Sequence, residues 1–458
     1  MEEEVHTGEI NREAEAAPAL IAVHPLERSI ALALGYELRV FDFEMDCAVT
    51  LTDEAYSPCH SDAIRAICFG ANGRLFVSAG DDKLVKIWRT DTWHCIRTVC
   101  SDKRVSAVAI SHDGLFVTFA DKFGVVWIER LEEDDQGQAS VDKKAVPLLG
   151  HYCSIITSLK FSPDGKFIAT ADRDFKIRIT IFPKGPLKGA HEIQNFCLGH
   201  TDFVSCLTFI CPPDCHQSFL LSGSGDATVR LWDHVSGQLL DTCDVGEKEN
   251  LLLGDGRTPE VYLQSTRNGW QAGLLDSKEK VEYSAAVTDI NALPDGSFVA
   301  AAIQGLHGVM ILKCDVPARR LFIAKFVFVE ESFVPTRLGL SSSAKLLWVV
   351  MGASNVSKVG VSKMAQLRVL SDLDKFLSNE HGDYPVILKD KDMPGGEKLL
   401  LQFQGSDHVT KQDAALAATA TAVKVAMQNL LTKKQYSLEK RDFRKRDRND
   451  RKFKKQQF

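Results

Sequence analysis

The residues of this chain that most resemble reactive groups lie between positions 200 and 226. His200, Ser224 and Asp226 are the three residue types of a hydrolase triad, in which histidine deprotonates serine and aspartate orients the histidine. The stretch "CPPDCH" (211–216) offers two thiols and an imidazole, which are zinc ligands. No second ligand pair lies at zinc spacing, so we predict no metal site.

A second group of candidate residues is the charged cluster in "TADRDFKIRIT" (170–180), where five charged residues fall between Asp172 and Arg178. An apolar run before the cluster and alternating isoleucines after it predict two strands joined by a tight turn. Alternate strand residues share a face, so Lys176 and Arg178 are expected to lie together. Either Asp172 and Asp174 neutralise these cations within the chain, or a partner supplies the carboxylates.

The elements that position both groups belong to a repeat. "LGHTDFVSCLTFICPPDCHQSFLLSGSGDATVRLWD" (198–233) contains Gly-His, an alternating strand, a second strand, a turn with Asp, and a third strand ending in Trp-Asp. This order is the signature of a WD repeat. Similar units, strong or weak, occupy residues 18–43, 59–88, 103–128, 149–180, 283–312 and 335–352. Seven units predict an all-β fold, a seven-bladed β-propeller, whose closure removes exposed sheet edges.

The repeat gives the triad-like residues a structural interpretation. His200, Ser222 (or Ser224), Asp226 and Trp232 take repeat positions that are expected to form a hydrogen-bonded set within one blade. Asp174 takes the place of Asp226 in its own unit, so we predict the same role for it. The sequence also has no phosphate-binding loop and no dinucleotide fingerprint. We therefore predict a non-catalytic platform rather than an enzyme.

Alignment of the units shows which cluster residues are unusual. Arg178 takes the place of Arg230, so a base at that position is not unusual by itself. Arg173 stands where that unit has Gly225, and Lys176 stands where it has Thr228. The excess charge of the cluster therefore comes from Arg173 and Lys176.

Composition and charge define the rest of the chain. The 458 residues are 45% hydrophobic and 25% charged, which is ordinary for a globular protein. No stretch approaches the ~18 apolar residues of a membrane span, and the acidic start does not resemble a secretory signal. The twelve cysteines are scattered, mostly within apolar runs, which favours a reducing compartment. We expect an acidic extension (1–17), a propeller (18–405) with an insertion (245–280), a helix (406–435) and a basic tail (436–458).

The basic tail differs in charge from the rest. Residues 433–458 contain twelve Lys or Arg and four acidic residues, a net charge of +8, so the remainder of this −6 chain carries −14. The bases that we single out for contact with nucleic-acid phosphates are Lys440, Arg441, Arg444, Lys445, Arg446, Arg448, Arg451 and Lys452. A nuclear-import signal or a solvated charge run explains the same residues equally well.

Residues 161–240, together with "FADKFGVVW" (119–127), resemble the WD-repeat subunit of the eukaryotic tRNA (guanine-N7-)-methyltransferase complex. The resemblance implies a nuclear, non-catalytic scaffold without a cofactor of its own. Its expected partner is the catalytic subunit, which uses S-adenosylmethionine to methylate a variable-loop guanosine in tRNA, and the two would form a heterodimer. The resemblance implies a contact at Lys176 and Arg178, and it extends to Asp172, Arg173 and Lys122.

Two other functions fit a propeller. Substrate receptors of ubiquitin ligases typically have Trp-Asp-x-Arg at a blade end, but "WDHV" at Trp232 and "WRTD" at Trp88 lack that arginine. A chromatin or peptide-binding scaffold has no positive sign in the sequence, and nothing excludes it.

Overall fold

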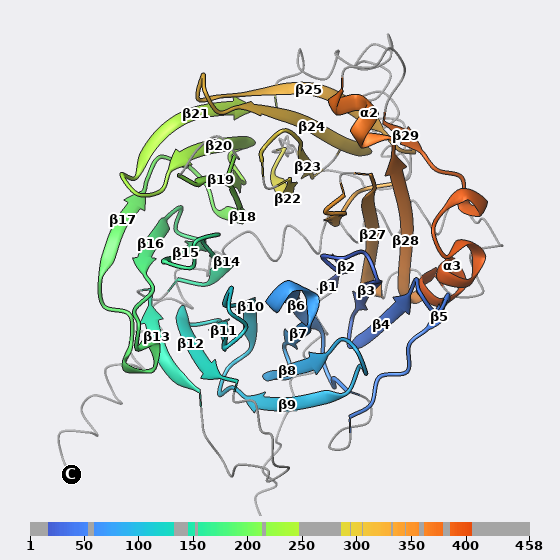
Figure 1. The fold of residues 1–458 in the computed structure, drawn as a ribbon, viewed down its shortest axis with the longest axis horizontal. Coiled ribbons are helices and arrows are strands. Elements are labelled where there is room, and N and C mark those ends of the chain that lie inside the picture. The colour runs from blue at the N-terminus through green and yellow to red at the C-terminus, as the bar shows by residue number, and fades with distance from the viewer. Residues whose placement is uncertain are drawn as a thin grey trace, which may run out of the picture.

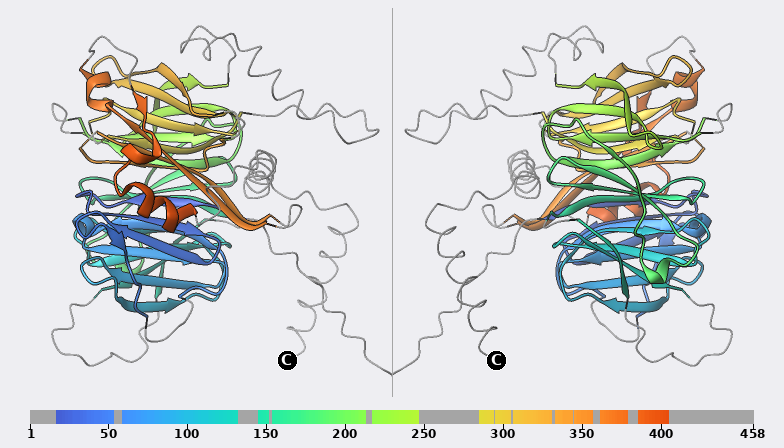
Figure 2. Two further views of the ribbon diagram at one scale, coloured as in Figure 1. Left: turned by 90° about the vertical axis from the view of Figure 1, so that its right-hand side faces the viewer. Right: turned by 90° about the vertical axis from the view of Figure 1, so that its left-hand side faces the viewer.

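Each repeat unit folds into a small antiparallel sheet, and seven sheets stand side by side around a central axis (Figure 1). The computed structural model describes residues 17–404, apart from 54–58, 132–144, 152–153, 213–216, 247–284, 294, 305, 331–332, 344, 357–360 and 379–384. Seen from the side, the blades form one disc-like layer (Figure 2). The chain is therefore a seven-bladed propeller, as the repeat predicted.

The strands of each blade follow one another in sequence from the axis to the rim. Blades 1 to 3 contain β2 (Leu20–Val23), β3 (Ser29–Leu34), β4 (Glu37–Asp42) and β5 (Cys47–Ala48); β6 (Ile64–Gly70), β7 (Leu75–Gly80), β8 (Leu84–Arg89) and β9 (Cys95–Cys100); and β10 (Val105–Ile110), β11 (Phe116–Asp121), β12 (Val125–Arg130) and β13 (Val146–Gly150). Blades 4 to 6 contain β14 (Ile156–Phe161), β15 (Phe167–Asp172), β16 (Ile177–Ile181) and β17 (Ile193–Cys197); β18 (Val204–Ile210), β19 (Phe219–Ser224), β20 (Thr228–Asp233) and β21 (Gln238–Asp244); and β22 (Val287–Ala292), β23 (Val299–Ile303), β24 (Gly308–Asp315) and β25 (Arg320–Phe328). Blade 7 contains β26 (Arg337–Leu340), β27 (Leu347–Val356), β28 (Val361–Ser371) and β29 (Val386–Ile387), and it also receives β1 (Ala17–Pro18).

The core lies between neighbouring blades. Alternating strand residues point toward the next blade, so each pair of neighbours shares an apolar cluster; Ala169 and Ile177 of blade 4, for example, pack with Val204 of blade 5. Trp88 and Trp232 are fully buried in two of these clusters. Because the packing is blade to blade, the turns at both ends of the ring are left at the surface.

Hydroxyl groups at bulges join the innermost strands around the axis. In each of β10, β14 and β18 the register shifts at one residue, which is Ser106, Thr157 or Ser205. Each of these hydroxyls lies within hydrogen-bonding distance of a backbone carbonyl on the second strand of its own blade and of another on the inner strand of the next blade. The bulges therefore fix neighbouring blades to one another.

The ring is closed by segments from both ends of the described chain. β1 pairs with β27 in blade 7, and the Thr336 hydroxyl donates to the Ala19 carbonyl at 3.0 Å. The helices α2 (Leu373–Leu377) and α3 (Gly396–Gln404) lie on the rim (Figure 1). Arg39 of β4 donates to the last carbonyls of α3, at Gln402 and Phe403. Both ends thus brace the seam between blades 7 and 1.

Several predicted segments fall outside the described residues: the acidic extension (1–16), nearly all of the insertion (247–280), and the helix and basic tail (406–458). α2 and α3 lie within the segment 18–405, for which the repeat pattern predicted only blades. None of the helices in the described part of the chain has the length and apolar character needed to cross a lipid bilayer.

Candidate functional site

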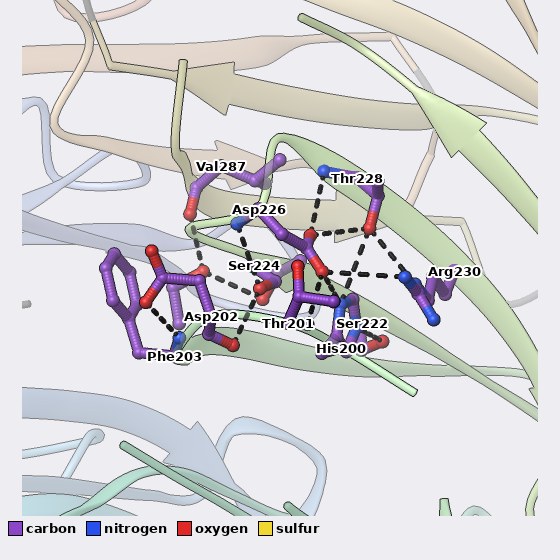
Figure 3. A network of polar contacts seen from close by, with 12 residues as sticks. His200, Thr201, Asp202, Phe203, Ser222, Ser224, Asp226, Thr228, Arg230 and Val287 are labelled. Atoms are coloured by element: carbon purple, nitrogen blue, oxygen red, sulfur yellow. Dashed lines mark hydrogen bonds and ion pairs between the residues drawn. The ribbon is translucent and has the colours of Figure 1, made fainter. Parts of the chain in front are cut away.

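The triad-like residues of blade 5 form a buried hydrogen-bonded chain (Figure 3). His200 Nδ1 lies 2.9 Å from Asp226, His200 Nε2 lies 2.7 Å from Ser222 Oγ, and Trp232 Nε1 donates to the same hydroxyl at 2.8 Å. Ser224 instead donates to the Asp202 carbonyl at 3.0 Å, so Ser222 is the serine of the set. A hydroxyl that is fully buried and bonded to both Trp232 and His200 is not open to a substrate.

The ionisation states in blade 5 also fit a structural role. Burial alone would raise the pKa of Asp226, but hydrogen bonds from His200 and Thr228 outweigh it, and the pKa lies well below the ordinary value. Burial lowers the pKa of His200 despite the adjacent carboxylate. A neutral imidazole therefore donates from Nδ1 to an ionised Asp226 and accepts at Nε2 from Ser222. Blade 2 has the same set in His60, Asp82, Ser78 and Trp88.

In blade 4 the aspartate of this set is Asp172 and not Asp174. His151 Nδ1 lies 2.9 Å from Asp172, and His151 Nε2 lies 2.7 Å from the Thr170 hydroxyl. Asp172 also accepts the backbone N–H groups of Asp174 and Lys176, and it is only 2% exposed. The sequence prediction exchanged the roles of the two aspartates. Asp172 cannot reach a partner from this position, so its prediction as a docking residue is wrong.

Strand register explains the exchange. Thr170 pairs with Arg178 as Ser222 pairs with Arg230, so Asp174 is indeed aligned with Asp226. Asp172 precedes Asp174 by two residues, and it is nevertheless the carboxylate that reaches His151, the histidine of blade 4. Asp121 of blade 3 uses the same geometry: its carboxylate accepts the N–H groups of residues 123 and 125, and also Trp127 Nε1 at 3.0 Å. The sequence carried a signal for this geometry: in both blades the aspartate follows an alanine and precedes a base, as Ala-Asp-Lys in blade 3 and Ala-Asp-Arg in blade 4.

Asp172 is turned inward, and the residues of the turn that are exposed to solvent are Phe175 and Lys176. Lys176 is exposed, and its ammonium makes no hydrogen bond or ion pair with the described part of the chain. Lys122 on the equivalent turn of blade 3 is also exposed. Arg173 is half-buried, and its backbone N–H donates to the Ile155 carbonyl at 3.1 Å. The two turns thus present cations at the same end of neighbouring blades.

Arg178 differs from Lys176 in its surroundings. Its side chain is half-buried, Nε donates to the Thr180 hydroxyl at 3.0 Å, and Nη1 donates to the Gly150 carbonyl at 3.0 Å. Burial lowers the pKa of the guanidinium. Thr180, which replaces the blade tryptophan, therefore holds Arg178 in place. The expectation that Lys176 and Arg178 form one exposed strand face is wrong, because Lys176 belongs to the turn and β16 begins at Ile177.

The described residues contain no group of three His, Cys, Asp or Glu side chains that could hold a metal ion. Cys215 and His216 of the "CPPDCH" stretch lie outside the described residues.

Comparisons with known proteins identify the family. Residues 128–327 match the tRNA methyltransferase TRM82 WD40 domain, and residues 52–89 match the WD domain, G-beta repeat. The tRNA (guanine-N(7)-)-methyltransferase non-catalytic subunit wdr4 of Dictyostelium discoideum is 28% identical over 81% of this chain and 80% of the relative. The wdr4 subunit of Xenopus laevis is 30% identical over 73% of this chain and 75% of the relative. The human WDR4 match, at 34% identity, spans about half of each protein, 46% and 47%.

Solved structures agree on the fold. "Structure of U3-55K" aligns with a TM-score of 0.53 and 16% identity over 73% of this chain and 90% of that one. "Crystal structure of RRP9 WD40 repeats" aligns with a TM-score of 0.53 and 17% identity. At these identities the likeness concerns the propeller alone.

Fold and site together define a WD-repeat propeller in which the triad-like residues join strands within a blade and the turns of blades 3 and 4 present charge. The chain belongs to the family of non-catalytic subunits of tRNA (guanine-N(7)-)-methyltransferase. This membership supports the methyltransferase hypothesis and gives no support to a ubiquitin-ligase or chromatin adaptor.

Proposed function

We propose that this chain binds and stabilises the catalytic subunit of a tRNA (guanine-N7-)-methyltransferase, which forms N7-methylguanosine in the tRNA variable loop. The two chains form a heterodimer in the nucleus, without a membrane, and tRNA binds to the complex. S-adenosylmethionine binds the catalytic subunit only, and this chain holds no cofactor. A partner that binds only the folded propeller also stabilises it by mass action. The names of the relatives support this proposal.

The observation that carries the docking site is an unmatched positive charge on blade 4. Equivalent positions in blades 2, 4 and 5 hold the bases Lys86, Arg178 and Arg230. Lys86 pairs with Asp53 at 2.5 Å, and Arg230 pairs with Asp226 at 3.5 Å. Arg178 pairs with no carboxylate among the described residues, and neither does the nearby Lys176. In blade 4 the carboxylate bound to His151 lies two residues earlier, beneath the turn, so a carboxylate of the partner completes the pair.

The proposed contact set is therefore Lys176, Arg178, Arg173 and Lys122, with Asp172 acting as a positioning residue beneath them. Lys176 and Lys122 supply exposed charge, and Arg178 supplies a guanidinium whose Nη2 has no partner in the described residues. A guanidinium held in a fixed orientation suits bidentate binding of a carboxylate.

The clearest test is Lys176→Glu, because this exposed side chain makes no hydrogen bond or ion pair within the described residues. The variant is expected to keep the melting temperature of the wild type and to bind the methyltransferase at least about tenfold more weakly, since like charges at an interface repel. Binding is measured by titration with the purified catalytic subunit, and folding by thermal unfolding of the same preparation.

The matched control is Lys83→Glu, which reverses an exposed lysine on the equivalent turn of blade 2. Equal weakening by both variants would indicate a general charge effect and would contradict a site on blade 4. Arg178→Glu would be a less specific change, because a carboxylate next to the Gly150 carbonyl would also destabilise the blade.

A further inference from the structure

The blade 4 turn holds an aromatic side chain in a backbone conformation that disfavours it. Phe175 has φ 69°, in the left-handed region. The equivalent residues of blades 2, 3 and 5 are Lys83 (φ 67°), Gly124 (φ 87°) and Ala227 (φ 60°). The turn therefore requires this conformation, which glycine adopts most readily and bulky residues rarely do. Phe175 is 41% exposed, so burial within the fold does not account for the aromatic ring.

A second exposed aromatic residue stands on the neighbouring turn. Phe123 of blade 3 is 53% exposed. The ammonium groups of Lys103 and Lys122 lie 5.5 Å and 5.7 Å from the centre of its ring, within the range of cation–π attraction. These contacts hold the ring at the surface without covering it.

One segment of chain supports both turns. A Cβ on Gly124 would lie 2.2 Å from the Ser154 carbonyl oxygen, so the blade 3 turn is in close contact with the segment that leads into β14. On the other side of that segment, the Arg173 backbone N–H donates to the Ile155 carbonyl at 3.1 Å. The turns that carry Phe123 and Phe175 therefore flank the same few residues at the same end of the ring.

Charge around the two rings is mainly positive at the surface. Lys122 and Lys176 are exposed, whereas Asp121 and Asp172 are 3% and 2% exposed and Asp174 is half-buried. An aromatic centre surrounded by cations complements an apolar surface rimmed by carboxylates. Such centres, where aromatic residues are excluded from water, carry most of the affinity in protein interfaces.

We propose that Phe123 and Phe175 are the apolar anchors of the docking surface, and that the methyltransferase subunit covers them with an apolar patch bordered by acidic residues. This proposal rests on the proposed function and adds the apolar part of the contact to its charged part. The rings provide desolvated area, and Lys122 and Lys176 fix the orientation of the partner.

The variant Phe175→Gly tests whether the Phe175 ring binds the partner or stabilises the fold. Glycine suits the left-handed turn, so the melting temperature is expected to stay the same or rise, while affinity for the purified methyltransferase subunit falls at least about tenfold. Phe123→Ser is expected to weaken binding similarly with the fold unchanged. The matched control is Ala227→Gly, which makes the same backbone change in blade 5 and is expected to bind as the wild type does.

Each outcome decides the proposal. Binding by Phe175→Gly and Phe123→Ser at wild-type affinity would overturn the anchors and leave the charged docking site standing. A lower melting temperature for Phe175→Gly would assign the ring to the fold and equally overturn its role as an anchor. If the wild-type chain does not bind the methyltransferase subunit at all, the proposed function itself fails.

Discussion

A buried carboxylate at Asp172 accepts hydrogen bonds from two backbone amides and from His151. Burial by itself would raise its pKa, but these bonds outweigh burial, and the pKa of Asp172 lies below its ordinary value. The turn from Arg173 to Lys176 is therefore fixed from beneath. This residue sets where the exposed cations stand, although its own side chain is buried.

We predict that Asp172→Asn destabilises the fold by about 1–3 kcal/mol at neutral pH, because an amide cannot accept all of these bonds and its NH2 group competes with the imidazole N–H. The folded pKa is depressed, so the contribution of Asp172 is complete above the unfolded pKa of about 3.9 and is lost as the pH falls below it. Chemical unfolding from pH 7 to pH 2.5 should show a shallower loss of stability for the variant.

Asp174→Asn is the paired variant for this measurement, because the repeat alignment predicted Asp174 for the same role. A larger loss of stability for Asp174→Asn than for Asp172→Asn would contradict the bond between Asp172 and His151 in blade 4.

At the scale of the strand, the bulges on the inner strands join one blade to the next. Thr157 sits at the register shift of β14, and its hydroxyl faces carbonyls of Ala171 in its own blade and Val204 in blade 5. In blade 2 the bulge residue is Arg65, which pairs with Asp81 instead. The same backbone irregularity thus supports two kinds of side-chain contact.

We predict that Thr157→Val, which keeps the shape and removes the hydroxyl, lowers the free energy of unfolding by about 1–3 kcal/mol, since a buried carbonyl loses its donor. Thr201→Val is the control, because Thr201 is exposed and its hydroxyl makes no hydrogen bond within the described residues. Denaturant unfolding of both variants gives the comparison. Equal stability of the two would mean that the bulge hydroxyls do not hold the blades together.

At the scale of the whole molecule, charge is divided between an acidic body and a basic tail. The tail bases from Lys440 to Lys452 lie outside the described residues, and residues 1–432 carry a net charge of −14. Phosphates of a bound tRNA would be repelled by most of the chain and attracted by its end. The proposed docking surface, by contrast, lies on blades 3 and 4.

We predict that truncation after Thr432 weakens tRNA binding by the complex and flattens its salt dependence. The slope of log affinity against log salt should fall by roughly 0.7–0.9 for each phosphate that the tail neutralises. Methyltransferase binding should not change. A full-length chain in which glutamine replaces the tail bases is the control, because it removes the charge of the tail and keeps its length. An unchanged slope would contradict tRNA contact, and nuclear import or solvated charge would then explain the tail.

The blade architecture follows from the order of residues along the chain. Strand alternation, Gly-His and Trp-Asp pairs and turn residues recur at a fixed spacing, and each unit buries its apolar residues only against its neighbours, so local pattern is enough to predict seven blades. The blade 5 set of His200, Asp226 and Trp232 could be predicted for the same reason: each residue occupies its repeat position.

Contacts between side chains from different parts of the chain could be identified only in the folded structure. Spacing gave Asp174 the repeat position of Asp226, but in the folded turn Asp172, two residues earlier, is the carboxylate that reaches His151. Alternation placed Arg178 on an exposed face, but the Gly150 carbonyl at the end of blade 3 lies against it. The seam formed by β1 and α3 joins residues far apart along the chain, and no local period carries that information.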